Sequence, residues 1–134
     1  MIVVDTNIIV YLYLPTEFTA QAESLLANEP EWVAPNLWRS EFRNVLALYL
    51  RKKLLTFDEA YALQVEAEDL LNHSEYDLAS YDVLTLANNS QCSAYDCEFV
   101  ALAKQLNIQL VTMDKQVLRQ FPGVAVSLND ALPS

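Results

Sequence analysis

Residues 1–12 read Met-Ile-Val-Val-Asp-Thr-Asn-Ile-Ile-Val-Tyr-Leu, and Asp5 is the only charged side chain in this largely apolar stretch. The β-branched run before it, Ile2–Val4, predicts a short buried strand. Asp5 therefore stands where that strand ends. The sequence leaves two explanations open for it: Asp5 caps a following helix, or it carries a carboxylate into a functional site.

Short apolar runs elsewhere predict further strands, and amphipathic segments between them predict helices. Strands are expected at Trp32–Ala34, Ile108–Thr112 and Val124–Val126. Helices are expected from Thr16 or Glu17 to Ala27, from Asn36 as the cap to Lys53, from the Thr56–Glu59 capping box to about Asn72, and over 79–87, 93–106 and 115–120. Strands that alternate with helices pair in parallel through crossover connections, so we expect an α/β fold.

The composition predicts one globular unit. The 134 residues, of which 53% are hydrophobic, suit a single domain over residues 1–134. No apolar run reaches the roughly 18 residues of a membrane helix, and the first residues lack the basic flank of a secretory signal. We therefore expect a soluble, cytoplasmic protein. The spacing of Cys92 and Cys97 matches neither a metal motif nor a disulfide framework, which predicts buried thiols.

The charges are unevenly distributed along the chain. The net charge is −10, and residues 54–103 contain ten acids but no Lys or Arg. Five of the eight basic residues lie within 36–53: Arg39, Arg43, Arg51, Lys52 and Lys53. They predict a local basic face on an acidic protein, for which a solvated helix surface is the simplest explanation.

Two acids are expected on helix surfaces that face the core. In the helix that contains most of the basic residues, the apolar stripe lies on both sides of Glu41. Asn44, three residues later, lies at the edge of the same arc. In the helix expected over 93–106, Asp96 falls among the inward-facing residues. Ser93–Asp96 is also a capping-box pattern, so a structural explanation for Asp96 stays open.

Four acids are thus candidates for one site. Asp5 and Asp114 follow predicted strands, where capping is the alternative explanation, and a parallel sheet would bring them toward Glu41 and Asp96. Two like charges 4 Å apart repel by roughly 4 kcal/mol at an effective dielectric near 20. A cation removes this repulsion, and oxygen ligands favour Mg²⁺ or Mn²⁺. The Lewis acidity of such an ion suits phosphate-ester chemistry.

In their order along the chain, these residues resemble the PIN-domain nucleases. The resemblance rests on Val3–Asn7, on Glu41 with Asn44, on Tyr95–Asp96 and on Leu110–Asp114. It covers essentially the whole chain, whose length is similar to that of VapC-type toxins. It implies a three-layer sandwich with a central parallel sheet of four to five strands flanked by helices. It also implies a Mg²⁺- or Mn²⁺-dependent endoribonuclease that cleaves structured RNA such as tRNA or rRNA, forms a homodimer and is inhibited by a cognate antitoxin.

The resemblance also assigns roles to positions in this sequence. It implies that four acids are catalytic and hold one or two metal ions: Asp5, Glu41, Asp96 and Asp114. Supporting polar residues would be Asn7 and Thr112, with Asn44 beside Glu41. Because phosphate contacts dominate nucleic-acid affinity, the candidates for contact with the RNA backbone are Arg39, Arg43, Arg51, Lys52 and Lys53. Their alternative role is to solubilise the helix and interact with its dipole.

Three other function classes are alternatives to an endoribonuclease. A phosphoryl-transfer enzyme of the haloacid-dehalogenase kind expects a second acid two residues after Asp5, where Asn7 stands. A phosphorelay receiver expects a lysine at a late strand end, which Thr112–Asp114 does not supply. A catalytically inactive PIN-fold module that binds a protein partner stays open, because a net charge of −10 repels RNA at long range.

Overall fold

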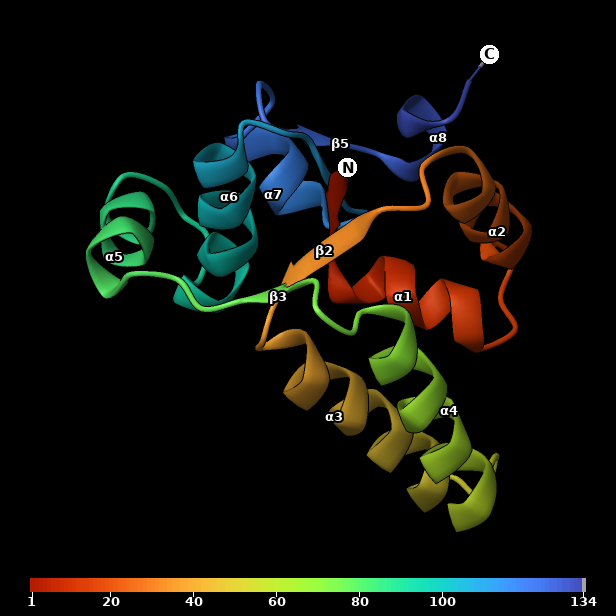
Figure 1. Ribbon diagram of the computed structural model, residues 1–134. Coiled ribbons are helices and arrows are strands. Elements are labelled where there is room, and N and C mark those ends of the chain that lie inside the picture. The colour runs from red at the N-terminus through yellow and green to blue at the C-terminus, as the bar shows by residue number, and fades with distance from the viewer. Residues whose placement is uncertain (134) are drawn as a thin grey trace.

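Five short strands form one parallel sheet at the centre of the computed structural model, which describes residues 1–133 (Figure 1). They are β1 (Ile2–Val4), β2 (Trp32–Pro35), β3 (Glu75–Tyr76), β4 (Leu110–Val111) and β5 (Ala125–Val126). The order across the sheet is β3-β2-β1-β4-β5, and every pairing is parallel. Residues of β1, β2 and β4 are buried throughout, as expected for a parallel sheet covered on both faces.

Helices connect the strands and lie on both sides of the sheet. The crossovers from β1 to β2 to β3 contain α1 (Thr6–Tyr13), α2 (Thr19–Asn28), α3 (Trp38–Arg51) and α4 (Phe57–Leu70). The later part of the chain contains α5 (Ser80–Asn88), α6 (Ala94–Leu106), α7 (Lys115–Gln120) and α8 (Leu128–Ala131). Figure 1 shows α3 and α4 as a hairpin that projects away from the sheet. The predicted α/β fold with a parallel sheet flanked by helices is confirmed.

Large apolar side chains fix the helices against the sheet. Trp32, Trp38, Phe42 and Phe99 are all almost fully buried. Burial of one such side chain contributes about 1.5–3 kcal/mol. Helix α6 packs on β1, β2 and β4, and its residues 99–103 are buried. The first turn of α6 is therefore held firmly beside the carboxyl ends of the central strands.

Several predicted elements are confirmed, but the expected cap of α3 is wrong. Strand β1 and helix α7 have the expected bounds, and the Thr56–Glu59 capping box forms at the start of α4. The N-cap of α3 is Leu37, not Asn36. Asn36 instead continues the pairing with the neighbouring strand, because its N–H donates to the carbonyl of Tyr76 at 3.0 Å and its side chain donates to Asp77.

Three elements were not predicted as such. Strand β3 has only two residues, Glu75 and Tyr76, and lacks an apolar run that would reveal it. Helix α1 lies in a continuously apolar stretch without helical periodicity, and its only sign was Asp5 as a possible cap. Helix α8 has one turn.

Two further sequence expectations concern membranes and thiols. No helix within residues 1–133 combines the length and apolar character that a membrane crossing requires. Cys92 and Cys97 are both free and buried, which confirms the prediction of buried thiols.

Candidate functional site

The strand order determines where side chains at strand ends meet. From β1 the chain builds the sheet toward β2 and β3 on one side, and β4 and β5 lie on the other. Val4 pairs with Val111, and the N–H of Asp5 donates to the carbonyl of Val111 at 3.0 Å. Ligand sites of open α/β sheets lie in the crevice beyond the carboxyl ends where the order reverses. Asp5 and the residues that follow β4 therefore lie in such a crevice.

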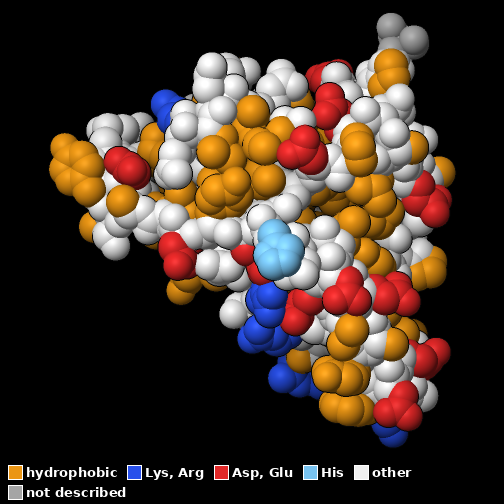
Figure 2. Space-filling view, in the orientation of Figure 1, with side chains coloured by type: hydrophobic (Ala, Val, Ile, Leu, Met, Phe, Trp, Pro, Cys, Tyr) orange, Lys and Arg blue, Asp and Glu red, His pale blue; other side chains and the backbone are white. Residues whose placement is uncertain are grey.

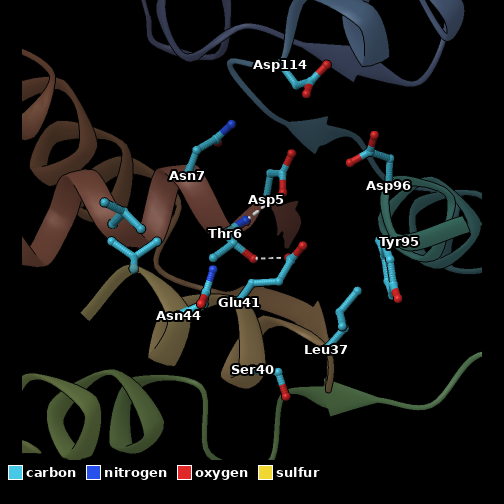
Figure 3. Close-up of a pocket in the computed structure, with 12 residues that line it drawn as sticks. Asp5, Thr6, Asn7, Leu37, Ser40, Glu41, Asn44, Tyr95, Asp96 and Asp114 are labelled. Carbon is cyan, nitrogen blue, oxygen red and sulfur yellow. Dashed lines mark hydrogen bonds between the residues drawn. The ribbon is translucent and has the colours of Figure 1, made fainter. Parts of the chain in front are cut away.

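A cavity of about 750 Å³ opens at this place, and four carboxylates face it (Figure 3). They belong to Asp5, Glu41, Asp96 and Asp114. The other lining residues are Thr6, Asn7, Val10, Leu37, Ser40, Asn44, Val45 and Tyr95. None of these twelve residues is Lys or Arg, so no cationic side chain of the lining balances the four acids.

Asp5 is held by two hydrogen bonds. Its Oδ1 accepts from the N–H of Thr6 at 2.7 Å, and its Oδ2 accepts from Oγ1 of Thr112 at 2.7 Å. Burial raises the pKa of Asp5 to about 6; the two hydrogen bonds oppose this change, while the charges of Glu41 and Asp96 add to it. Asp5 is the N-cap of α1, which confirms the capping explanation, and the same residue also lines the cavity.

Thr112 links Asp5 to the fourth acid. Its side chain is completely buried, and its Oγ1 accepts from the N–H of Asp114 at 3.0 Å while it donates to Asp5. Oδ1 of Asp114 accepts from the N–H groups of Gln116 and Val117 at 2.9 and 3.0 Å, which caps α7. Asp114 thus serves a helix cap and the cavity together.

Glu41 reaches the cavity from the first turn of α3. Oγ1 of Thr6 donates to its Oε1 at 2.7 Å (Figure 3). Burial raises the pKa of Glu41, the Thr6 hydrogen bond opposes this, and the charge of Asp96 adds to it. Thr6 therefore orients Glu41 and, through its N–H, holds Asp5 as well.

Asp96 reaches the cavity from the first turn of α6. Its N–H donates to Oγ of the N-cap Ser93 at 3.1 Å, so the predicted capping pattern contributes to the helix start. Burial raises the pKa of Asp96, the charge of Asp114 raises it further, and hydrogen bonding from Ser93 opposes both. Next to it, Tyr95 lies at the rim of the cavity and is largely exposed.

The donor set has the chemistry that hard divalent cations require. Carboxylate and amide oxygens in one cavity suit Mg²⁺ or Mn²⁺. Burial raises the pKa values of Asp5, Glu41 and Asp96, and the charges of neighbouring acids add to this change, so a bound cation would favour their ionised forms. As the side chains stand, no three Asp, Glu, His or Cys residues within residues 1–133 are grouped so as to hold a metal ion.

The supporting residues predicted from the sequence lie at or beside the cavity. Asn7 and Asn44 line it, and Thr112 lies beneath it. Oδ1 of Asn7 is buried and has no hydrogen-bond partner within the described residues. Thr6 and Ser40 were not predicted as site residues, although each is adjacent to a candidate acid in the sequence. Only the three-dimensional contact between α1 and α3 reveals that Thr6 orients Glu41.

The five predicted RNA contacts fall into two groups. Arg43, Arg51, Lys52 and Lys53 are exposed. Figure 2 shows Lys and Arg side chains along the α3 side of the projecting hairpin and acids along the α4 side. Arg39 differs, because its guanidinium forms ion pairs with Glu75 at 2.6 Å and Glu68 at 3.0 Å.

Comparison with known proteins decides the family. The PIN-domain family model matches residues 2–124, which is nearly the whole chain. The chain belongs to the PIN-domain family. This PIN domain is 32% identical over 126 residues to Ribonuclease VapC3 of Pyrobaculum aerophilum, an alignment that covers 92% of this chain and 96% of that protein. The resemblance described from the sequence is thus confirmed.

Solved structures support the same fold. FitAcB from Neisseria gonorrhoeae matches with a TM-score of 0.74 at 18% identity, covering 96% of this PIN domain and 98% of that chain. A toxin–antitoxin complex from Klebsiella pneumoniae matches with a TM-score of 0.67 at 15% identity, covering 96% and 98% of the two chains. At these identities the likeness establishes the fold.

Proposed function

We propose that this PIN domain is a divalent-metal-dependent endoribonuclease that cleaves structured RNA such as tRNA or rRNA, and that it acts as the toxin of a toxin–antitoxin pair. The observation that carries the proposal is the group of four carboxylates that face one cavity with no Lys or Arg in its lining. The similarity to a protein named Ribonuclease VapC3 supports RNA as the substrate.

The four acids would hold one or two Mg²⁺ or Mn²⁺ ions. When bound, such an ion supplies the Lewis acidity for phosphodiester hydrolysis. The chain itself orients the ligands: the hydroxyl of Thr112 fixes Asp5, and the hydroxyl of Thr6 fixes Glu41. Hydrogen bonds of this kind raise the affinity of metal sites because they reduce the freedom that the carboxylates would otherwise lose.

Cleavage of end-labelled tRNA and rRNA tests the proposal directly. With purified, antitoxin-free protein, we expect discrete cuts in Mg²⁺ or Mn²⁺ and none after EDTA treatment, with activity restored when the metal is returned. Cuts that persist in EDTA would contradict metal dependence. If the folded protein binds Mn²⁺ but cuts neither RNA, the alternative function gains support: an inactive PIN-fold module that binds a protein partner.

The basic residues at the end of α3 are proposed to contact the RNA backbone. Replacing Arg51, Lys52 and Lys53 together by alanine is expected to reduce the slope of log affinity against log salt by about 2–3, since each phosphate contact contributes roughly 0.7–0.9. RNA binding at several salt concentrations, measured without divalent metal, gives this slope.

The remaining basic residues offer a matched control. The triple variant Lys104→Ala, Lys115→Ala and Arg119→Ala makes the same change in net charge at exposed positions outside α3. We expect it to leave the slope nearly unchanged. Equal slopes for both triple variants would show that net charge, rather than a local contact, determines RNA affinity.

An antitoxin protein and a second copy of the chain are the proposed partners. The Klebsiella pneumoniae match is the structure of a toxin–antitoxin complex, which supports an antitoxin as partner for this PIN domain. Homodimerisation and a cytoplasmic location stay predictions from the family resemblance.

A further inference from the structure

Three N–H donors from the start of α3 bind the carboxylate of Glu75. Nε and Nη2 of Arg39 donate to the two oxygens of Glu75 at 2.6 and 2.7 Å. Nε1 of the fully buried Trp38 donates to the same carboxylate at 2.7 Å. Arg39 and Trp38 are the first two residues of α3, and Glu75 is the first residue of β3. The two-pronged geometry of the guanidinium therefore ties the start of α3 to the edge of the sheet.

The same guanidinium also reaches α4. Nη1 of Arg39 donates to Oε1 of Glu68 at 3.0 Å, and Nε2 of Gln64 donates to the other oxygen of Glu68 at 2.8 Å. The side chain of Glu75 is only 12% exposed, so its pairing with Arg39 is partly shielded from solvent. Arg39 donates three hydrogen bonds, two to Glu75 and one to Glu68, and the side chain of Glu75 is largely buried. Both facts disfavour the release of Arg39 to bind phosphate.

The start of α3 is anchored by the buried side chains of Trp38 and Phe42, but it has no side-chain cap. Its N-cap, Leu37, provides no side-chain hydrogen bond to the first-turn amides. Glu41 follows Arg39 by two residues, which places it about 200° around the helix, on the opposite side. On that side the hydroxyl of Thr6 holds the Glu41 carboxylate. The first turn of α3 is therefore held by polar contacts on two opposite sides: by Thr6 on the side of the cavity, and by the Arg39–Glu75 pair on the other side.

We propose that Arg39 and Glu75 form a clamp that positions Glu41, so that Arg39 is a positioning residue for the cavity and not an RNA contact. This inference rests on the proposed function of the four acids as metal ligands. It separates Arg39 from Arg43, Arg51, Lys52 and Lys53, with which the sequence had grouped it.

Titration calorimetry with Mn²⁺ and cleavage kinetics of Arg39→Ala test the clamp. Because loss of a residue that orients a ligand costs roughly 10–100-fold, we expect Mn²⁺ affinity and kcat to fall by that factor. KM for RNA and the salt dependence of RNA binding are expected to stay as in the wild type. Lys104→Ala, which removes one exposed positive charge from α6, is the matched control for charge.

Two milder variants keep the test decisive if thermal melting shows that Arg39→Ala is unfolded. Arg39→Lys keeps the charge but loses the two-pronged geometry, and Glu75→Gln weakens the pair; both are expected to reduce Mn²⁺ affinity and kcat in the same direction. Normal Mn²⁺ affinity and kcat in the folded variants, with weaker RNA binding and a shallower salt slope, would overturn the clamp. A wild type that neither binds Mn²⁺ nor cleaves RNA would instead refute the proposed function.

Discussion

The Asp96→Asn variant is expected to lose at least about 100-fold in RNA cleavage while keeping its fold. Loss of a residue that merely orients a metal ligand costs roughly 10–100-fold, so loss of a ligand should reach or exceed the upper end. Asp96→Asn removes the negative charge but keeps the hydrogen bond from the backbone N–H of residue 96 to Oγ of Ser93 at the helix start. Cleavage rates in Mn²⁺, with thermal melting as the check of folding, measure the effect.

Glu98→Gln is the matched control for Asp96→Asn. Glu98 also lies on α6 and is partly buried, and burial raises its pKa, with the charges of Glu41 and Asp77 adding to this. It does not line the acidic cavity. We expect its cleavage rate to stay close to that of the wild type. Equal losses in the two variants would mean that the negative charge of α6, and not ligation by Asp96, matters for activity.

Stability of the metal-free protein should depend on pH through Asp5. The folded state raises the pKa of this group from 3.8 to about 6, so it binds the proton more tightly than the unfolded state does. The resulting stabilisation is complete below about pH 4 and is lost as the pH rises through 6. Two pKa units at about 1.4 kcal/mol each give an expected loss of up to about 3 kcal/mol by pH 7.

Comparison with Asp5→Asn isolates this effect from all other titrating groups. The free energy of unfolding of both proteins is measured by urea titration in EDTA. Between pH 4 and 7 the wild type should lose up to about 3 kcal/mol relative to Asp5→Asn, because asparagine does not titrate. Asp130→Asn, at an exposed position in α8, is the matched control for the loss of one carboxylate. A constant difference between wild type and Asp5→Asn across this range would contradict the raised pKa.

The sequence predicted the elements whose pattern is local. Ile2–Val4 forms a strand because three β-branched residues are buried together, and the Thr56–Glu59 box forms because its bonds lie within one turn. Strand β3 was missed because Glu75 and Tyr76 pair through their backbones with β2, a contact that leaves no apolar pattern. The wrong cap at Asn36 has the same origin, since its N–H pairs with Tyr76.

The candidate site was predictable to a similar extent. Strand ends and the apolar stripe of α3 pointed to Asp5, Asp114 and Glu41, and the structure places these acids and Asp96 around one cavity. The hydrogen bonds of Thr6 and Thr112 could not be predicted, because they join residues 35 and 107 positions apart.

Asp5 and Asp114 each cap a helix and also line the cavity, which affects how related sequences should be interpreted. Asp5 and Asp114 cap α1 and α7, so a descendant that had lost catalysis would still be under selection to keep both for stability. The carboxylate of Glu41 instead accepts a hydrogen bond from the hydroxyl of Thr6 and takes no part in a helix cap. Under the proposed function, loss of the four acids in PIN domains without catalytic activity should therefore begin at the position equivalent to Glu41, and this position is the better marker of an active nuclease.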